Sequence, residues 1–368
     1  MIIAQILHHS AYAVGATFEQ VFLDGWHVRL GRELGKRTSW SIQCLMHDPC
    51  IQHIFSLKLN SVKLLAFHTD LSLRAGIEYS RELIHYLQYI SQKQDLLMHI
   101  HGDSNLMAGL LAAKFSHTPI VLQEHGYPPN FLTLKAARLL RNNIRFYLFL
   151  TNEKREYITE QSKFDKRKTA VQTMGIDLNL FKPLSQEKCR EAFNLPIDKF
   201  LVLYIGRFDS LKGLPIIIDI VRKLQKRYNI GLVAVGGSSN DPLYPLVRRA
   251  TPYVFGRIAN KIMPLIYGAG DALAYFFKDA RWSGPTVAAM EAMACNRYVI
   301  SNTLFHVQNQ IKNMDDYGCF TGTKESIQSI LEHLYVARPK CRSRLIAEKL
   351  FGWDVVIENM KNIYKLII

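Results

Sequence analysis

A strand-like segment in the second half of the sequence runs into a loop that carries two cations. Residues 204–213 place Arg207 and Lys212 between Gly206 and Gly213, directly before an apolar helical pattern. Guanidinium and ammonium groups beside the amino terminus of a helix can neutralise a pyrophosphate, including the charge that grows on a departing diphosphate. That chemistry needs no metal ion. On spacing alone, the same residues are equally typical of solvated loop charges.

Two further loops carry residues suited to a nucleotide. Residues 233–238 end an apolar run with Gly236 and Gly237, which let a ligand approach the backbone, although a strand-to-helix turn also needs glycine. Residues 282–295 enter a helical pattern after Gly284 and place Glu291 on an otherwise apolar face. A carboxylate there must be hydrogen-bonded, and either a ribose diol or an ordinary salt bridge would satisfy it.

Two strand ends in the first half carry histidine. Residues 98–105 end one strand pattern and begin a helix, so we expect His101 to point from a loop toward a ligand. Glu124 and His125 end the next strand in the same manner, so we expect them at the same edge of the sheet as His101. A lone histidine is more often structural than catalytic, and this interpretation stays open.

Short apolar runs alternate with longer helical patterns, which indicates parallel β-α-β units and an α/β fold. In such sheets ligands bind beyond the carboxyl ends of the strands, where all the motifs above lie. The predicted strands are 2–7, 63–67, 96–100, 120–123, 145–150, 200–205, 230–235, 254–255, 272–276 and 298–301. We predict an amino-terminal domain over 1–183, a second domain over 184–352 and a carboxyl-terminal helix over 353–368.

Length and composition fit two ordinary globular domains. The 368 residues are 48% hydrophobic and 21% charged, and the formal net charge is +15. This excess favours phosphate on a nucleotide, a nucleic acid or an anionic membrane, without choosing among them. The six cysteines have no zinc-ligand spacing, so we expect reduced thiols and no metal site. The sequence shows no apolar stretch of spanning length and no signal peptide, which favours the cytoplasm.

Together these motifs resemble the retaining GT-B glycosyltransferases of family GT4, and the likeness covers most of the chain. The family pattern of a strand, Gly-Arg, a short turn and Lys-Gly is similar to Gly206-Arg207 and Lys212-Gly213. Its linker pattern resembles residues 174–183, and its Glu-Ala-Met-Ala-Cys-Gly segment resembles residues 291–296. The His-x-His-Gly strand end corresponds to residues 99–102, and the element near the nucleotide base resembles residues 253–257.

The resemblance implies a GT-B fold, in which two Rossmann-like doubly wound domains face each other across a cleft and a carboxyl-terminal helix crosses back to the first. It implies that Arg207 and Lys212 hold the donor diphosphate, that Glu291 holds the ribose, and that His101 lies near the transferred sugar. The remaining donor-side positions that we carry over are Gly206, Gly236, Gly237, Arg257, Ile258, Ser283, Gly284, Thr286 and Val287.

Two positions depart from the family pattern. The first glutamate of the family's E-x7-E motif would fall at Ser283, with Asp279 as the nearest carboxylate that could replace it. The paired glycines expected after the first strand are replaced by residues 8–15, where Gly15 alone could serve on the acceptor side together with His101, Glu124 and His125.

The resulting hypothesis is a retaining transfer of sugar from a nucleotide diphosphate donor, without metal, to a glycan or lipid-linked acceptor. An alternative is a protein that binds a nucleotide sugar, or partners an active subunit, after losing turnover at Ser283. We expect no nucleic-acid binding, since no basic stripe is interleaved with aromatic residues. Residues 132–143 place Lys135, Arg138 and Arg141 on one helical face, which fits either peripheral contact with an anionic membrane or a solvated surface.

Overall fold

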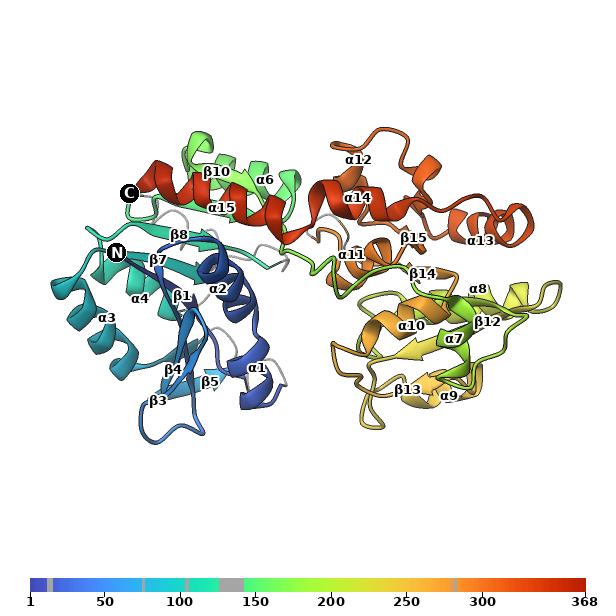
Figure 1. The fold of residues 1–368 in the computed structure, drawn as a ribbon, viewed down its shortest axis with the longest axis horizontal. Coiled ribbons are helices and arrows are strands. Elements are labelled where there is room, and N and C mark those ends of the chain that lie inside the picture. Colours follow the sequence, from blue (N-terminus) through green and yellow to red (C-terminus); the bar gives the residue numbers. More distant parts are fainter. Residues whose placement is uncertain (12–15, 75–76, 103–105, 126–141, 279, 281–282) are drawn as a thin grey trace. The chain divides into compact units, whose positions relative to one another are not determined.

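The computed structural model describes residues 1–11, 16–74, 77–102, 106–125, 142–278, 280 and 283–368. These residues form two compact units, drawn in Figure 1. Unit 1 comprises Met1–Met174 and Val356–Ile368, and unit 2 comprises Gly175–Val355.

Unit 1 is built on a sheet of eight described strands in the order β10-β9-β8-β7-β1-β2-β4-β3, parallel except for the β3–β4 pair. The order reverses between β1 and β7, which makes the carboxyl ends of these two strands the switch point of the sheet. The strands are β1 (Ile2–Leu7), β2 (Ser41–Asp48), β3 (Phe55–Leu59), β4 (Val62–His68), β7 (Leu96–His101), β8 (Ile120–Gln123), β9 (Phe146–Phe149) and β10 (Thr169–Val171), and β5 (Leu71–Arg74) pairs with β6 (Ile77–Tyr79) separately.

Helices cover both faces of this sheet. Side chains of α3 and α4 pack with Ile6 and Ile100 in one apolar core. On the opposite face, α2 packs on β1 and β2, and Tyr364 of α15 contacts β1 and β7. The helices of unit 1 are α1 (Phe18–Asp24), α2 (Trp26–Arg37), α3 (Arg81–Lys93), α4 (Leu106–Lys114) and α6 (Asn152–Ser162), and α15 (Trp353–Ile367) joins them from Val356 onward.

Unit 2 has a parallel sheet in the order β13-β12-β11-β14-β15-β16, with its switch point between β11 and β14. The strands are β11 (Phe200–Ile205), β12 (Ile230–Val235), β13 (Val254–Phe255), β14 (Ala272–Tyr275), β15 (Tyr298–Ser301) and β16 (Cys319–Phe320). The helices are α7 (Gln186–Glu191), α8 (Leu214–Leu224), α9 (Tyr244–Ala250), α10 (Met263–Ala269), α11 (Val287–Ala294), α12 (Phe305–Gln308), α13 (Ser326–Ala337) and α14 (Ser343–Leu350).

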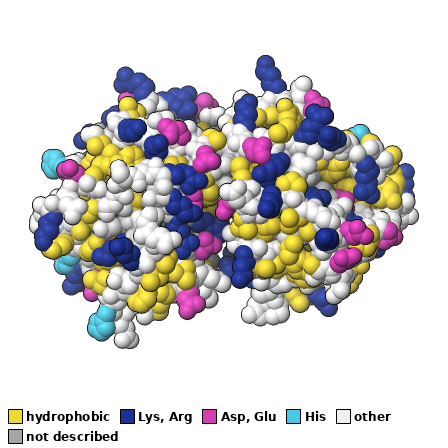
Figure 2. Space-filling view, viewed as in Figure 1, with side chains coloured by type: hydrophobic (Ala, Val, Ile, Leu, Met, Phe, Trp, Pro, Cys, Tyr) yellow, Lys and Arg dark blue, Asp and Glu magenta, His cyan; other side chains and the backbone are white. Residues whose placement is uncertain are grey.

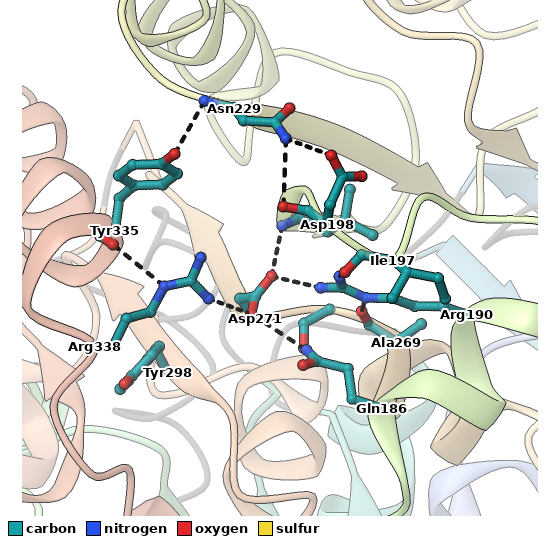
Figure 3. A network of polar contacts seen from close by, with 12 residues as sticks. Gln186, Arg190, Ile197, Asp198, Asn229, Ala269, Asp271, Tyr298, Tyr335 and Arg338 are labelled. Atoms are coloured by element: carbon teal, nitrogen blue, oxygen red, sulfur yellow. Dashed lines mark hydrogen bonds and ion pairs between the residues drawn. The ribbon is translucent and has the colours of Figure 1, made fainter.

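A buried carboxylate ties the amino ends of this second sheet together (Figure 3). Asp271, directly before β14, accepts hydrogen bonds from Arg190 Nη2 at 2.7 Å, the Leu201 amide at 2.6 Å, Gln186 Nε2 at 3.2 Å and Arg338 Nη1 at 3.3 Å. Asp271 and Arg190 are 9% and 3% exposed. Each buried charge therefore has a partner. We call Asp271 and the four residues that donate to it the Asp271 network.

The predicted α/β class with two Rossmann-like sheets is confirmed, and so is the return of the carboxyl-terminal helix to the first unit. The contact division differs from the expected boundary near Pro183. Residues 175–183, assigned to the first domain from sequence, lie in unit 2 because Ile176 and Phe181 are buried in its core.

Candidate functional site

The loops that follow β11 and β14 meet at the switch point of unit 2. The Phe276 amide donates to the Lys212 carbonyl at 3.0 Å, and the Lys278 amide donates to the Leu211 carbonyl at 3.1 Å. Gly213 makes this approach possible: its φ is +69°, and a Cβ there would lie 2.3 Å from the Phe276 carbonyl oxygen. The loops are therefore fixed to each other by their backbones.

Lys212 and Arg207 lie in the first of these loops. The Lys212 ammonium packs close to Gly206, where a Cβ would lie 3.0 Å from its Nζ. Among the described residues, Nζ makes no hydrogen bond or ion pair, whereas Arg207 Nε lies 3.4 Å from Asp209 Oδ2 with 73% of the Arg207 side chain exposed. Burial, reinforced by the charge of Arg207, lowers the pKa of Lys212, and Asp209 opposes the shift. A half-buried cation is thus held without an ion-pair partner in contact with it, and Asp209 is the described carboxylate that acts on its pKa.

The backbone on both sides of Arg207 is held by hydrogen bonds. The Tyr204 hydroxyl donates to the Arg207 carbonyl at 2.9 Å, and the Phe208 amide donates to Asp241 Oδ2 at 3.1 Å. The Ser238 amide donates to the same oxygen at 3.0 Å. These bonds lower the pKa of Asp241, and they join the loops that follow β11 and β12.

Paired glycines complete the second loop. Gly236 has a φ of +102°, and a Cβ there would lie 3.1 Å from the Gly206 carbonyl oxygen. At Gly237 a Cβ would lie 2.1 Å from the Phe208 ring. At both glycines the space that a Cβ would need is occupied by other parts of the protein, and the approach of a ligand stays a prediction.

Helix α11 starts at the same edge, after β14. Thr286 caps it by accepting from the Ala289 amide at 3.1 Å, and the Thr286 amide donates to the Tyr275 hydroxyl at 3.4 Å. Gly284 is buried, while Ser283 and Val287 are half-buried.

Glu291 lies two turns into α11 and is 7% exposed. Its Oε2 accepts from the Tyr267 hydroxyl of α10 at 2.7 Å. Burial raises the pKa of Tyr267 well above its usual value, and Glu291 adds to the shift, so the phenol remains a donor. The structure supplies one hydrogen-bond donor that the sequence analysis did not predict for this carboxylate.

The remaining predicted donor positions follow β13. Arg257 is exposed, and Ile258 packs partly buried against the core of unit 2. Gly256, next to them, receives a hydrogen bond from the Gly236 amide at 3.2 Å, which connects this segment to the glycine pair.

His101 lies at the end of β7 and is fully buried, so the structure corrects the expectation that it projects from a loop. Its Nε2 lies 2.8 Å from Gln5 Oε1, and its Nδ1 lies 3.2 Å from His125 Nε2. The half-buried His125 ring is nearly parallel to the rings of both His101 and Trp26, with centroid distances of 5.3 and 6.0 Å. His125, and not His101, is the exposed end of this pair.

Several more histidines crowd the switch point of unit 1. His8 Nδ1 contacts the His101 carbonyl, and the His8 ring occupies the space that a Cβ on Gly102 would need. Burial lowers the pKa of both His27 and His99 to about 3, and neighbouring histidines add to the shift. Burial also lowers the pKa of His8 and of His101 well below the usual value. These rings are therefore neutral at physiological pH.

Glu124 is placed differently from His125. Its carboxylate is fully buried, pairs with Lys154 Nζ at 2.9 Å and accepts from the Leu150 amide at 2.6 Å. The structure therefore corrects the expectation that Glu124 lies exposed beside His125, since its carboxylate is buried in an ion pair.

The structure brings the predicted residues together in two groups. Gly206, Arg207, Lys212, Gly236, Gly237, Ser283, Gly284, Thr286, Val287 and Glu291 follow neighbouring strands of unit 2, and His101 and His125 share the edge of unit 1. Gly15 and Asp279 lie outside the described residues, as do Lys135, Arg138 and Arg141 of the predicted membrane-facing helix. The sequence analysis missed Asp241, Tyr267, Gln5 and Tyr364. Tyr267 contacts Glu291 and Gln5 contacts His101, whereas Asp241 binds backbone amides beside the predicted loops and Tyr364 binds Gln5.

Two features are missing from the described residues. No group of three or more His, Cys, Asp or Glu side chains is arranged to hold a metal ion, and no helix is long and apolar enough to span a bilayer. Figure 2 shows more Lys and Arg than Asp and Glu on the visible face, with apolar side chains dispersed between them.

Comparisons with known proteins identify relatives. Residues 185–336 match the family "Glycosyl transferases group 1". A D-inositol 3-phosphate glycosyltransferase of Thermomonospora curvata is 21% identical over 265 residues, which cover 63% of this chain and 58% of that protein. The match thus spans less than two thirds of the relative.

Solved structures resemble the chain over nearly its whole length. Sucrose-phosphate synthase from Thermosynechococcus elongatus has a TM-score of 0.75 at 18% identity, covering 100% of this chain and 98% of that one. Anabaena HepE in complex with UDP has a TM-score of 0.73 at 17% identity, covering 99% and 100%, and HepE has also been solved with UDP-glucose. These similarities establish the GT-B fold.

Proposed function

We propose that this protein is a glycosyltransferase, because residues 185–336 match the glycosyl transferases group 1 family and the chain has the GT-B fold. It takes the sugar from a nucleoside diphosphate donor and transfers it, with retention of configuration, to a glycan or lipid-linked acceptor. The complexes of HepE with UDP and UDP-glucose support a uridine nucleotide as the first donor to test.

One observation carries the proposal: the Lys212 ammonium is half-buried beside Gly206 and makes no ion pair or hydrogen bond among the described residues. Holding a cation in that state costs free energy unless an anion binds there. The exposed Arg207 adds a second positive group with a fixed backbone. A diphosphate supplies the missing negative charge and departs more easily when both cations neutralise it, so the proposed reaction needs no metal.

Glu291 and the amino terminus of α11 account for the rest of the donor. The Glu291 carboxylate accepts from Tyr267, and the hydroxyls of a ribose are donors of the kind that a carboxylate binds. The first amides of α11, near Thr286 and Val287, add the positive end of a helix for a phosphate oxygen.

On the acceptor side, His125 replaces His101 as the residue nearest to a ligand, since His101 is fully buried with contacts at both ring nitrogens. The acceptor hydroxyl attacks the sugar on the face that the diphosphate leaves, and positive charge develops on the sugar. The protein acts by positioning and by stabilising the leaving group. A lipid-linked acceptor would bring the enzyme to the inner membrane surface, which flotation with anionic liposomes tests.

The direct experiment incubates the purified chain with radiolabelled nucleotide sugars, starting with UDP-glucose, and with glycan and lipid extracts as acceptors. We expect labelled product from one donor, and linkage analysis should show the anomeric configuration of the donor preserved. Tight nucleotide binding without transfer from any donor would support the alternative of a protein that lost turnover at Ser283. If the chain neither binds a nucleotide nor transfers a sugar, the proposal is rejected.

A further inference from the structure

The segment that follows β1 carries polar side chains at the switch point of unit 1. Strand β1 ends at Leu7, beside the carboxyl end of β7, and the structure describes the segment that follows as far as Ala11. Residues 8–11 read His-His-Ser-Ala, so hydrogen-bonding side chains stand where the family pattern has glycine. Ligands of open α/β sheets bind at such switch points. The segment is therefore a place to look for substrate contacts in unit 1.

Two buried carboxylates fix the backbone of this segment. Glu78 on β6 is fully buried and accepts from the Ser10 amide at 3.0 Å and from the Ser10 hydroxyl at 2.5 Å. Asp48, the last residue of β2, is 4% exposed and accepts from the Ala11 amide at 2.9 Å. Charge-assisted hydrogen bonds of this kind are stronger than neutral ones. The chain directly after His9 is thus held in one position.

The residue before His9 is fixed as well. His47 Nε2 donates to the His8 carbonyl at 3.3 Å, and His8 Nδ1 contacts the His101 carbonyl. The His8 ring meets the His9 ring edge to face, with centroids 4.8 Å apart and an interplanar angle of 78°. The His9 ring therefore packs against a side chain that is itself anchored.

The proton of His9 can be assigned from one contact. His9 Nδ1 lies 3.0 Å from the Ser10 carbonyl oxygen. A carbonyl oxygen only accepts, so Nδ1 carries the proton, and Nε2 of the neutral ring keeps a lone pair. Burial lowers the pKa of His9, and the Ser10 carbonyl and the Glu78 carboxylate oppose that shift. The ring is neutral at physiological pH, and Nε2 is its hydrogen-bond acceptor.

This acceptor nitrogen differs from those of the neighbouring histidines. His47 and His101 are fully buried, and each has contacts at both ring nitrogens. The His9 side chain is half-buried, and within the residues that the structure describes its Nε2 makes no hydrogen bond. An acceptor in a fixed position at the switch point suits a ligand that brings a donor, such as a hydroxyl group.

We propose that His9 binds the acceptor substrate, with Nε2 accepting the hydrogen bond of an acceptor hydroxyl. The inference rests on the proposed function, which assigns the donor to the loops of unit 2 and the acceptor to unit 1. A hydroxyl that donates its proton to Nε2 keeps its oxygen lone pairs for the anomeric carbon of the sugar. Since the backbone on both sides of His9 is held before any substrate binds, little ordering of this residue is needed on binding.

Two substitutions separate the role of Nε2 from that of Nδ1. His9→Asn keeps an amide nitrogen where Nδ1 lies, so the bond to the Ser10 carbonyl survives, but it removes Nε2. His9→Gln does the reverse, because its longer side chain brings an amide to the position of Nε2. Rates are measured with UDP-glucose and with the glycan or lipid extract that supports transfer by the wild-type chain.

We expect His9→Asn to lower kcat/KM for the acceptor by about 10- to 100-fold, because an acceptor hydroxyl is left without its partner on binding. UDP affinity, measured by calorimetry, should equal that of the wild type. His9→Gln should recover most of the lost rate.

His68→Asn is the matched control. His68 ends β4, is half-buried like His9, and its Nδ1 donates to the Ile51 carbonyl at 2.6 Å. Strand β2 separates β4 from β1, so His68 does not lie at the switch point. This variant should have the wild-type kcat/KM for the acceptor.

A second readout needs no change in rate. Long-range ¹⁵N–¹H NMR of the full chain labelled at histidine reports which ring nitrogen is protonated, and the His9 signals are identified by their loss in His9→Gln or His9→Asn. We expect Nδ1–H at His9. Adding the active extract in the presence of UDP should shift the Nε2 resonance of His9 and leave that of His68 in place.

Four outcomes overturn the inference: a proton on His9 Nε2 in the wild type, an unshifted Nε2 resonance with the active extract, wild-type transfer by His9→Asn, or a greater loss in His9→Gln than in His9→Asn. The last pattern would mean that the ring acts only through its bond to Ser10. A wild-type chain that transfers sugar from no donor would instead reject the proposed function.

Discussion

The two ends of the sheet in unit 2 differ in how far the protein itself neutralises their charged side chains. At the amino ends, Asp271 is buried with two arginines, a glutamine and a backbone amide directed at it (Figure 3). At the carboxyl ends, Lys212 is half-buried and makes no ion pair among the described residues, and the largely exposed Arg207 shares Asp209 with it as the nearby carboxylate. At the amino ends the buried charges are paired, whereas at the carboxyl ends two cations share one carboxylate and keep a net positive charge.

This difference separates stability from function. Removing one member of a satisfied buried network leaves the others desolvated and unpaired, so the cost falls on folding. Removing a cation that the protein does not neutralise costs folding little, and the loss falls on the ligand that neutralises it. The comparison therefore predicts which measurement each substitution changes.

Replacing Asp271 should have the largest effect. Asp271→Asn removes the counter-charge of the buried Arg190 and should lower the free energy of unfolding of unit 2 by about 3–5 kcal/mol. Urea unfolding followed by circular dichroism measures this, with separate transitions fitted for the two units if they are resolved. The protein that remains folded should bind nucleotide normally.

The control for Asp271 is an exposed ion pair on the same unit. Asp219 lies 2.8 Å from Lys223 with both side chains more than half exposed. Asp219→Asn should change stability by less than about 0.5 kcal/mol. If Asp271→Asn changed the free energy of unfolding as little as Asp219→Asn, the Asp271 network would not stabilise unit 2.

Replacing Lys212 should produce the opposite pattern. Lys212→Met keeps the apolar stem and removes the charge, so it should weaken UDP binding by about 10- to 100-fold. It should lower kcat/KM by about 100- to 1000-fold, since the departing diphosphate loses a stabilising group. Calorimetry and initial rates measure the two effects, and the unfolding free energy should stay the same or rise.

Lys223→Met is the matched control, because it removes a lysine charge from the exposed surface of α8. Its UDP affinity and rate should equal those of the wild type. A Lys212→Met protein that binds UDP normally would exclude the diphosphate site at this loop.

The lowered pKa of Lys212 gives a pH test with two opposite signs. Because the folded pKa lies below 10.5, the folded state releases this proton before the unfolded state does as the pH rises. Between the two pKa values the unfolded state binds more protons, so the contribution of Lys212 to stability increases with pH. The neutral amine attracts a diphosphate less, so UDP affinity should fall over the same alkaline range.

Calorimetric titrations from neutral pH to about pH 10 follow this change. Lys212→Arg serves as the control, since a guanidinium stays charged throughout and should remove the alkaline loss of affinity. An alkaline loss of the same size in both proteins would assign the titration to another group.

The fold was predictable where strands are continuous apolar runs. The predicted bounds of β1, β8, β11, β12, β13 and β15 agree with the structure to the residue. Strand β2 was missed because it carries polar residues that obscure the pattern, and these residues find hydrogen-bond partners in distant parts of the sequence. Gln43 binds Tyr86, His47 binds Thr69, and Asp48 accepts from the Ala11 amide.

The candidate site was predictable where its parts are local in sequence. Arg207 and Lys212 lie in one loop, and glycine spacing marks that loop. Partners supplied by other elements were not predictable: Tyr267 reaches Glu291 from another helix, and Tyr364 meets Gln5 across 359 residues. The alternation of His99 and His101 with apolar neighbours was a local signal that both histidines lie on one face of a strand.

The smallest expected effect tests a residue that lies at the carboxyl end but is satisfied within the protein. The Thr286 side chain accepts from the Ala289 amide and caps α11, so Thr286→Ala should cost about 1 kcal/mol of stability. Thr286→Ser keeps the hydroxyl and should restore most of that loss. Both variants keep the backbone amides of α11, so UDP affinity should not change in either. A loss of affinity in Thr286→Ala comparable to that of Lys212→Met would mean that the hydroxyl binds the ligand directly. A side chain whose hydrogen bond is already satisfied within the protein would then also contribute to UDP binding, which contradicts the contrast drawn between the two ends of the sheet.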